Sequence, residues 1–138
     1  MARYVPEAGD IVWLNFTPQA GHEQAGHRPA LVVSPAAYND KTSLMICCPM
    51  TTQIKNYPFE VLVAGAPPSV VLADQVKSLD WRVRKAKRKG AVSAEELADV
   101  RAKIVALICQ VHHLLQESHT THIEEYPRAG CERRRARG

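Results

Sequence analysis

Side chains that can do acid–base and phosphate chemistry gather in three polar segments, each next to an apolar stretch. The first holds Glu23, His27 and Arg28, the second holds Thr51, Thr52, Gln53 and Lys55, and the third holds Asp74, Gln75 and Lys77. Together they would supply a titratable acid, a guanidinium, hydroxyls and ammonium groups. An Arg side chain pairs with two phosphate oxygens at once, which Lys does not do. The set therefore suits a phosphodiester, which in RNA is cleaved without a metal when the ribose 2′-hydroxyl attacks the neighbouring phosphate.

The stretches that must position these side chains are typical of short strands. Apolar and β-branched runs at 11–16, 30–33, 44–48, 59–63 and 70–73, separated by turn residues, predict five strands in a small barrel or bent sheet. We expect Pro49 to end the third strand. Gly26 and Pro29 flank Arg28, so this side chain is expected where a polar loop meets a rigid strand.

The hydrophobic period becomes helical in the last third of the chain. Ser93 and Glu96 have the spacing of a capping box, and apolar residues with helical spacing follow as far as Leu115. We therefore predict one helix from about Ala94 to about Glu117. Residues 118–138 are polar and contain an arginine cluster at 133–135, so we predict a single domain over 1–117 followed by a disordered basic tail.

Length and charge agree with one compact domain. The chain has 138 residues and a net charge of +4, and six of the eight residues from Arg82 to Lys89 are basic. This basic run is interpreted either as a solvated loop or as a surface that steers polyanions toward the protein. No apolar run approaches the roughly 20 residues needed to span a bilayer, and no signal peptide is apparent.

The cysteines and the late histidines do not predict a metal site. The four cysteines have neither zinc-site spacing nor the pattern of a disulfide framework, which favours a reducing cytoplasm. Six residues near the end fit no closed ligand set: Cys109, His112, His113, His119, His122 and Cys131. We therefore expect no metal and no cofactor.

An ordered set of motifs makes the chain resemble a known family. Gly-Asp-Ile-Val-Trp stands at 9–13, Glu-Gln-Ala-Gly-His-Arg-Pro-Ala at 23–30, Ser-Pro at 34–35, Pro-Met-Thr-Thr-Gln at 49–53, Tyr-Pro-Phe-Glu at 57–60 and Ala-Asp-Gln-Val-Lys-Ser at 73–78. This set closely resembles the MazF/PemK toxins over residues 3 to about 108. The resemblance implies a mainly β fold with α, a small SH3-like barrel with a long C-terminal helix, and a homodimer.

The resemblance also implies an activity and a partner. The expected activity is a sequence-specific, metal-independent endoribonuclease that cleaves single-stranded mRNA and leaves a 2′,3′-cyclic phosphate and a 5′-hydroxyl. The expected partner is a cognate MazE-like antitoxin with an acidic tail. The alternative is a non-enzymatic toxin of the same fold that binds another protein, such as DNA gyrase. An Arg28–Thr51 pair distinguishes the two, because a ribonuclease needs it and a gyrase poison does not.

Matching positions assign the family's catalytic residues to this chain. The catalytic Arg corresponds to Arg28, the catalytic Thr to Thr51, and an acid implicated in activity to Glu23. A guanidinium with a pKa above about 12 is a poor proton shuttle at neutral pH. We therefore expect Arg28 to stabilise phosphate charge, Thr51 to donate a hydrogen bond to the phosphorane, and Glu23 to act as the base. Whether Arg28 also donates a proton stays open.

Seven further residues are expected to hold bases and phosphates: Asn15, Phe16, His27, Lys55, Tyr57, Gln75 and Lys77. Aromatic rings stack on unpaired bases and Lys follows the backbone. Phe16 is equally consistent with a core strand position, and His27 with a structural role. Trp13 and Trp81 are assigned to core or dimer packing.

Overall fold

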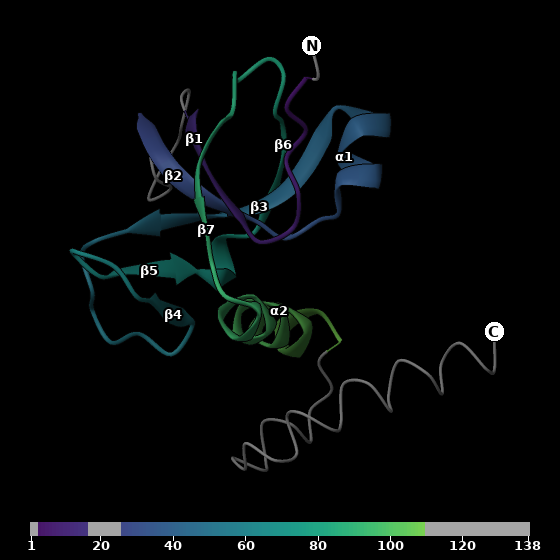
Figure 1. The fold of residues 1–138 in the computed structure, drawn as a ribbon. Helices are drawn as coiled ribbons and strands as arrows, with labels where there is room; N and C mark the ends of the chain where they lie inside the picture. Colours follow the sequence, from purple (N-terminus) through teal and green to yellow (C-terminus); the bar gives the residue numbers. More distant parts are fainter. Residues whose placement is uncertain (1–2, 17–25, 110–138) are drawn as a thin grey trace, which may run out of the picture.

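The protein is described by a computed structural model that covers residues 3–16 and 26–109. Its strands are β1 (Asp10–Asn15), β2 (His27–Val32), β3 (Leu44–Thr51), β4 (Glu60–Val63), β5 (Ser69–Leu72), β6 (Lys77–Asp80) and β7 (Lys87–Ala91). The helices are α1 (Ala36–Thr42), the short 3-10 helix η1 (Ala73–Gln75) and α2 (Ala94–Ile108). Figure 1 shows α2 beside β4 and β5, whereas α1 lies near β3 at the other end of the molecule.

The strands form one bent antiparallel sheet in the order β4-β5-β3-β2-β1-β7, with β6 also paired to β3. β3 organises the sheet because it changes partner along its length. It pairs with β6 over 44–47, with β2 over 47–49, and with β5 at Met50 and Thr51. The result is a half-barrel with a C-terminal helix, which confirms the predicted mainly β, barrel-like fold.

Two apolar clusters occupy the two sides of the bend. One joins α2 to β3, β4 and β5, and its fully buried members include Val71 and Val100. The other fills the space between β1, β2 and β3, and includes Leu14, Met45 and Trp81. Burying a large aliphatic or aromatic side chain stabilises a fold by about 1.5–3 kcal/mol, so these clusters hold the strand ends in fixed positions.

Two predictions about the strands are wrong. Pro49 does not end the third strand; it lies inside β3, opposite Ala30 of β2. Its missing N–H falls where β3 passes from β2 to β5, so neither ladder is interrupted in its middle. The end of the basic run, Lys87 to Lys89, also begins β7, which pairs with β1, so the interpretation of the run as a solvated loop is wrong for this part. β7 is at the edge of the sheet, where charged residues, especially Lys, are common.

The start of the last helix is as predicted, but its end is not. The Ser93 side chain accepts the backbone N–H of Glu96 and the Glu96 side chain accepts that of Ser93, which completes the capping box. The helix ends at Ile108 with Cys109 as its C-cap, so the predicted continuous helix to Glu117 is wrong at Cys109. Leu107 and Ile108 are 44% and 69% exposed, so the apolar stripe loses its packing partners there. Residues 110–138, including the predicted tail and the late histidines, lie outside the described residues.

The remaining expectations concern cysteines, metals and membranes. Cys47 and Cys48 are free, and burial raises the pKa of each thiol to about 12. Cys109 is not a free thiol, which the absence of a disulfide pattern did not predict. In the described part of the chain, no cluster of three His, Cys, Asp or Glu side chains is placed to hold a metal ion. No helix there is long and apolar enough to cross a membrane.

Candidate functional site

A polar pocket of about 530 Å³ opens beside the end of β3. It unites the second and third polar segments of the sequence, because its lining includes Thr51, Gln53, Lys55, Tyr57, Asp74 and Gln75. Thr51 comes from the last position of β3, while Asp74 and Gln75 come from η1, which follows β5. The bend of β3 toward β5 therefore brings Thr51 to the same pocket as Asp74, which lies 23 positions later in the chain.

The loop between β3 and β4 is held in shape by two carboxylates. The Glu60 carboxylate accepts the backbone N–H of Lys55 at 3.2 Å and that of Tyr57 at 3.3 Å. The Tyr57 hydroxyl donates to Asp74 Oδ2 at 2.9 Å, and this bond raises the pKa of Tyr57 because a phenolate would face a carboxylate. Glu60 was not among the site residues predicted from the sequence. The feature that could have indicated its role is an acidic residue at the start of an otherwise apolar strand.

Thr51 and Gln75 present polar groups to this pocket. Thr51 Oγ1 accepts the backbone N–H of Gln53 at 3.1 Å, so the hydroxyl proton of Thr51 is available to an oxygen in the pocket. Gln75 Oε1 is buried with no hydrogen-bond partner among the described residues. Buried polar atoms are nearly always satisfied in native proteins, so this oxygen is a candidate acceptor for a ligand.

Arg28 belongs to β2, where it lies opposite Leu14 of β1. On its other side, β2 pairs with β3 in a register that sets Ala30 opposite Pro49. Arg28 lies two residues before Ala30 in β2, and Thr51 lies two residues after Pro49 in β3, where β3 has already turned to pair with β5. Arg28 and Thr51 therefore come from neighbouring strands, at the end where the β2–β3 ladder stops. Glu23 lies outside the described residues.

The other predicted contacts divide between surface and core. His27 is exposed, and its ring stacks on that of Trp13 with centroids 6.1 Å apart and planes at 23°. Phe16 is 2% exposed, so its ring cannot stack on a base; the core alternative for this residue is the one observed. Lys77 Nζ lies 5.4 Å from the Phe16 ring centroid, in a cation–π contact.

The tryptophans differ from each other. Trp81 is 5% exposed and belongs to the core, as predicted. Trp13 is 40% exposed and is not a core residue in this structure. The basic run also departs from expectation, because Arg84 Nη1 donates to the carbonyl oxygen of Asn15 at 2.6 Å. Its first half therefore lies against a residue that we expected to bind RNA.

Comparison with known proteins extends the likeness over the whole described fold. A family model described as PemK-like, MazF-like toxin of type II toxin–antitoxin system matches residues 7–108. A curated relative from Escherichia coli strain K12, named Endoribonuclease toxin MazF, is 55% identical over 109 residues, which cover 78% of this chain and 98% of the relative.

Solved structures agree. Crystalline MazF from Deinococcus radiodurans matches with a TM-score of 0.73 at 56% identity, covering 77% of this chain and 98% of that one. A MazE–MazF structure from the same organism matches with a TM-score of 0.70 at 55% identity, covering 79% of this chain and 100% of that one. The matched family region contains both core clusters and every described residue of the pocket, and the chain belongs to the PemK-like, MazF-like toxins of type II toxin–antitoxin systems.

Proposed function

We propose that this chain is a sequence-specific endoribonuclease toxin that cleaves single-stranded mRNA without a metal ion and thereby stops translation. The observation that carries the proposal is the polar pocket lined by Thr51, together with the position of Arg28 on the neighbouring strand β2, at the end where the β2–β3 ladder stops. A guanidinium and a hydroxyl donor acting on one phosphate would match the charge that develops on a pentacoordinate phosphate. The relative at 55% identity is named an endoribonuclease, in agreement with this chemistry.

In the proposed reaction, Glu23 takes the proton from the ribose 2′-hydroxyl and the 2′-oxygen bonds to the phosphorus. Arg28 and Thr51 stabilise the charge on the phosphorane. The bond from phosphorus to the 5′-oxygen then breaks, and that oxygen takes up a proton. The products are a 2′,3′-cyclic phosphate and a 5′-hydroxyl. The proton lost at the 2′-hydroxyl balances the one gained at the 5′-oxygen, so the reaction needs no co-reactant.

The pocket supplies the contacts that hold the RNA. Lys55 and the exposed Tyr57 stand at its rim, where an ammonium can follow the phosphates and a ring can stack on a base. The unsatisfied oxygen of Gln75 can accept a base N–H. Asn15, His27 and Lys77 extend this set of contacts beyond the pocket, and Phe16 is removed from it because it is buried.

The toxin acts as a homodimer in the cytoplasm, where mRNA is translated, and a MazE-like antitoxin neutralises it. One of the similar solved structures is a MazE–MazF structure from Deinococcus radiodurans, and the match covers 100% of the matched chain of that structure. An acidic antitoxin segment would compete with RNA for the same cations, since both partners are polyanions.

Cleavage in the presence of a chelator tests the proposal. The purified full chain, mixed-sequence RNA and EDTA should give discrete cuts that end in a 2′,3′-cyclic phosphate and a 5′-hydroxyl. Arg28→Ala should abolish these cuts, whereas Arg3→Ala should leave them unchanged, because Arg3 is an exposed side chain on the N-terminal segment. An absence of cuts would favour the non-enzymatic alternative, and loss of cuts on chelation would overturn the metal-independent mechanism.

A further inference from the structure

A second pocket, of about 560 Å³, lies beside β6 and shares no lining residue with the first. It is bounded by the ends of the β1–β2 pair, by β6 and by the turn that follows β6; the residues that matter are Asn15, His27, Asp80, Val83, Arg84 and Lys85. Two of them, Asn15 and His27, were expected from the sequence to contact RNA. The cations Arg84 and Lys85 come from the basic run, which was interpreted from the sequence either as a solvated loop or as a steering surface.

One short stretch of chain contributes to the lining of both pockets. Asp74 and Gln75 line the first pocket, Ser78 and Asp80 line the second, and Lys77 lies between these residues in the sequence. Three residues of extended chain cover roughly 10 Å, so the Cα atoms of Gln75 and Ser78 are no further apart than about this distance. An RNA strand that contacts both residues would need to span only this distance.

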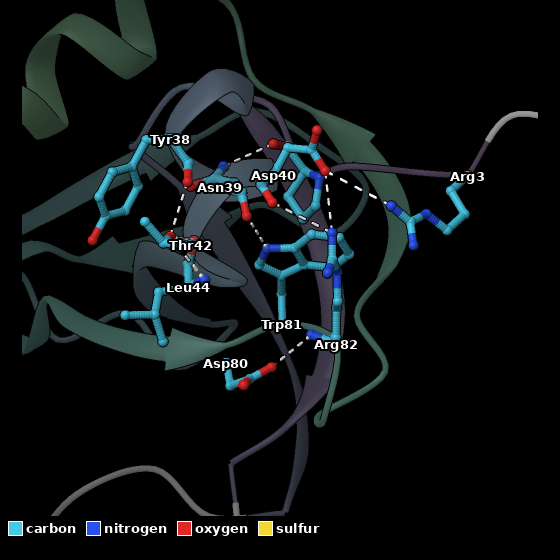
Figure 2. Close-up of polar contacts among 10 residues, drawn as sticks. Arg3, Tyr38, Asn39, Asp40, Thr42, Leu44, Asp80, Trp81 and Arg82 are labelled. Carbon is cyan, nitrogen blue, oxygen red and sulfur yellow. Dashed lines mark hydrogen bonds and ion pairs between the residues drawn. The ribbon is translucent and has the colours of Figure 1, made fainter.

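The turn that carries the cations is fixed in place (Figure 2). Asp80 Oδ1 accepts the backbone N–H of Arg82 at 3.0 Å. The same oxygen accepts the backbone N–H of Val83 at 2.9 Å. Trp81 Nε1 donates to the carbonyl oxygen of Asn39 at 2.8 Å, and Arg82 Nη2 donates to Asp40 Oδ1 at 3.1 Å. A preformed turn loses little conformational freedom when a ligand binds to it.

Arg84 and Lys85, at the end of the turn, line the pocket, and hydrogen bonds hold both residues in place. Arg84 Nη1 is held on the Asn15 carbonyl at 2.6 Å. Lys85 is exposed and has a φ of 54°, in the left-handed region that non-glycine residues seldom occupy. Such conformations are concentrated at functional sites. Lys85 N also donates to the carbonyl oxygen of Arg82 at 3.2 Å, which closes the turn around this conformation.

Rings and an apolar wall complete the site. The exposed His27 ring is stacked on Trp13 and forms a flat face, and Val83 is 75% exposed beside it. A nucleotide combines a π-face with a phosphate, and single-stranded RNA is bound by stacking together with cations. An acidic peptide would use the cations but would leave the stacked rings unused.

We propose that this second pocket binds a nucleotide that flanks the cleaved bond, with its base on the His27–Trp13 pair and its phosphate on Arg84 and Lys85. The inference rests on the proposed ribonuclease function and deepens it. The protein then contacts a longer stretch of RNA than the catalytic pocket covers, and part of the basic run is a binding site with a defined occupant.

Lys85→Asn tests the phosphate contact, because Asn tolerates a positive φ and should preserve the turn. The matched control is Lys89→Asn, which removes an exposed charge of the same run from a position outside the pocket. The probe is RNA centred on the mapped cut site with a 2′-deoxyribose there, in one form with flanking nucleotides and in one without them. Lys85→Asn should weaken binding of the long RNA about two- to fivefold at low salt. It should also reduce the salt slope by about 0.7, the value for one phosphate contact on a single strand.

Several outcomes separate this proposal from its alternatives. Equal losses in Lys85→Asn and Lys89→Asn, or a loss that persists on the short RNA, would reduce the run to general steering and overturn the proposal. Weaker binding of a poly-glutamate peptide with unchanged RNA binding would assign the pocket to an acidic protein partner instead. The unchanged chain could cut RNA in EDTA while Lys85→Asn binds the long and the short RNA as tightly as the unchanged chain does. In that case the proposal for the second pocket fails and the proposed ribonuclease function stands.

The stacking contact has its own test. His27→Phe keeps a flat ring and should retain affinity for the long RNA, whereas His27→Ala should lose affinity for the long RNA and not for the short one. Equal affinities of the Phe and Ala variants for the long RNA would rule out stacking on this ring.

Discussion

At the residue scale, the hydroxyl of Thr51 has a defined direction of use. Its oxygen accepts the N–H of Gln53 at 3.1 Å, which occupies one lone pair and leaves the proton to be donated elsewhere. Thr51 is the last residue of β3 and lines the polar pocket. The strand therefore holds a hydrogen-bond donor at a fixed point of the pocket, where the proposed reaction uses it to stabilise the phosphorane.

Removing this hydroxyl should slow the chemical step more than it weakens binding. Thr51→Val keeps the shape of the side chain but loses the donor, so we expect kcat to fall about 10²- to 10³-fold with little change in KM. Thr51→Ser should retain most of the activity. The matched control Thr52→Val removes an exposed hydroxyl that does not line the pocket, and single-turnover cleavage should be unchanged. A large rise in KM with normal kcat in Thr51→Val would contradict this role.

At the element scale, the start of α2 is tied to the sheet as well as capped. The Glu96 carboxylate accepts the backbone N–H of Ser93 at 2.9 Å and that of Ala64, just after β4, at 3.0 Å. These two bonds lower the pKa of Glu96 below 4.5, since both favour the charged form. The Glu96 side chain thus connects the start of α2 to the residue that directly follows β4.

The lowered pKa of Glu96 fixes the sign of a pH dependence. The bonds stabilise the fold above the unfolded-state pKa of about 4.5, and this contribution is lost as the pH falls through the lower folded-state pKa. Glu96→Gln should therefore be less stable at pH 7 by roughly 0.5–1 kcal/mol, a small effect because the carboxylate is well solvated.

Urea unfolding at a series of pH values measures this difference. The gap in the free energy of unfolding between the unchanged chain and Glu96→Gln should narrow as the pH falls below 4.5. Glu95→Gln, at a more exposed position in the same turn, is the control and should alter stability less. A gap that stays constant from pH 7 to about pH 3 would show that the Glu96 charge makes no contribution.

At the scale of the whole molecule, the fully buried Asn39 connects distant segments. Its Nδ2 donates to the carbonyl oxygens of Pro6 at 2.7 Å and Ser34 at 3.1 Å, and its Oδ1 accepts from Ser34 Oγ at 2.6 Å. Its backbone carbonyl accepts the indole N–H of Trp81 at 2.8 Å. The N-terminal segment, the end of β2, α1 and the basic turn therefore meet at one residue of α1.

Asn39→Ala should destabilise the protein by about 2–4 kcal/mol, because it leaves several buried polar groups without partners. Thermal or urea unfolding measures the loss. Asp40→Ala is the control on the same helix: its ion pairs with Arg3 and Arg82 are at the surface, so it should cost less than about 1 kcal/mol. Similar losses in the two variants would contradict the central place of Asn39.

The sequence by itself determined the family, the barrel-like β fold, the capping box of α2 and most residues of the polar pocket, because these depend on local motifs in a fixed order. Only the tertiary structure decided that Phe16 is buried, that Pro49 lies inside β3, and that a charged edge strand follows the basic turn. Each of these depends on which strand lies next to which, and local patterns do not carry that information.

The arrival of Arg28 and Thr51 at the same end of neighbouring strands likewise depends on the pairing of β2 with β3. The contact of Arg84 with Asn15 joins residues 69 positions apart. Composition indicated that residues 82–89 could attract polyanions, but only the folded chain brings two of those cations beside Asn15 and His27. The bend of the sheet brings side chains from distant segments into one site. Packing in the two apolar clusters sets this bend, and no single segment does.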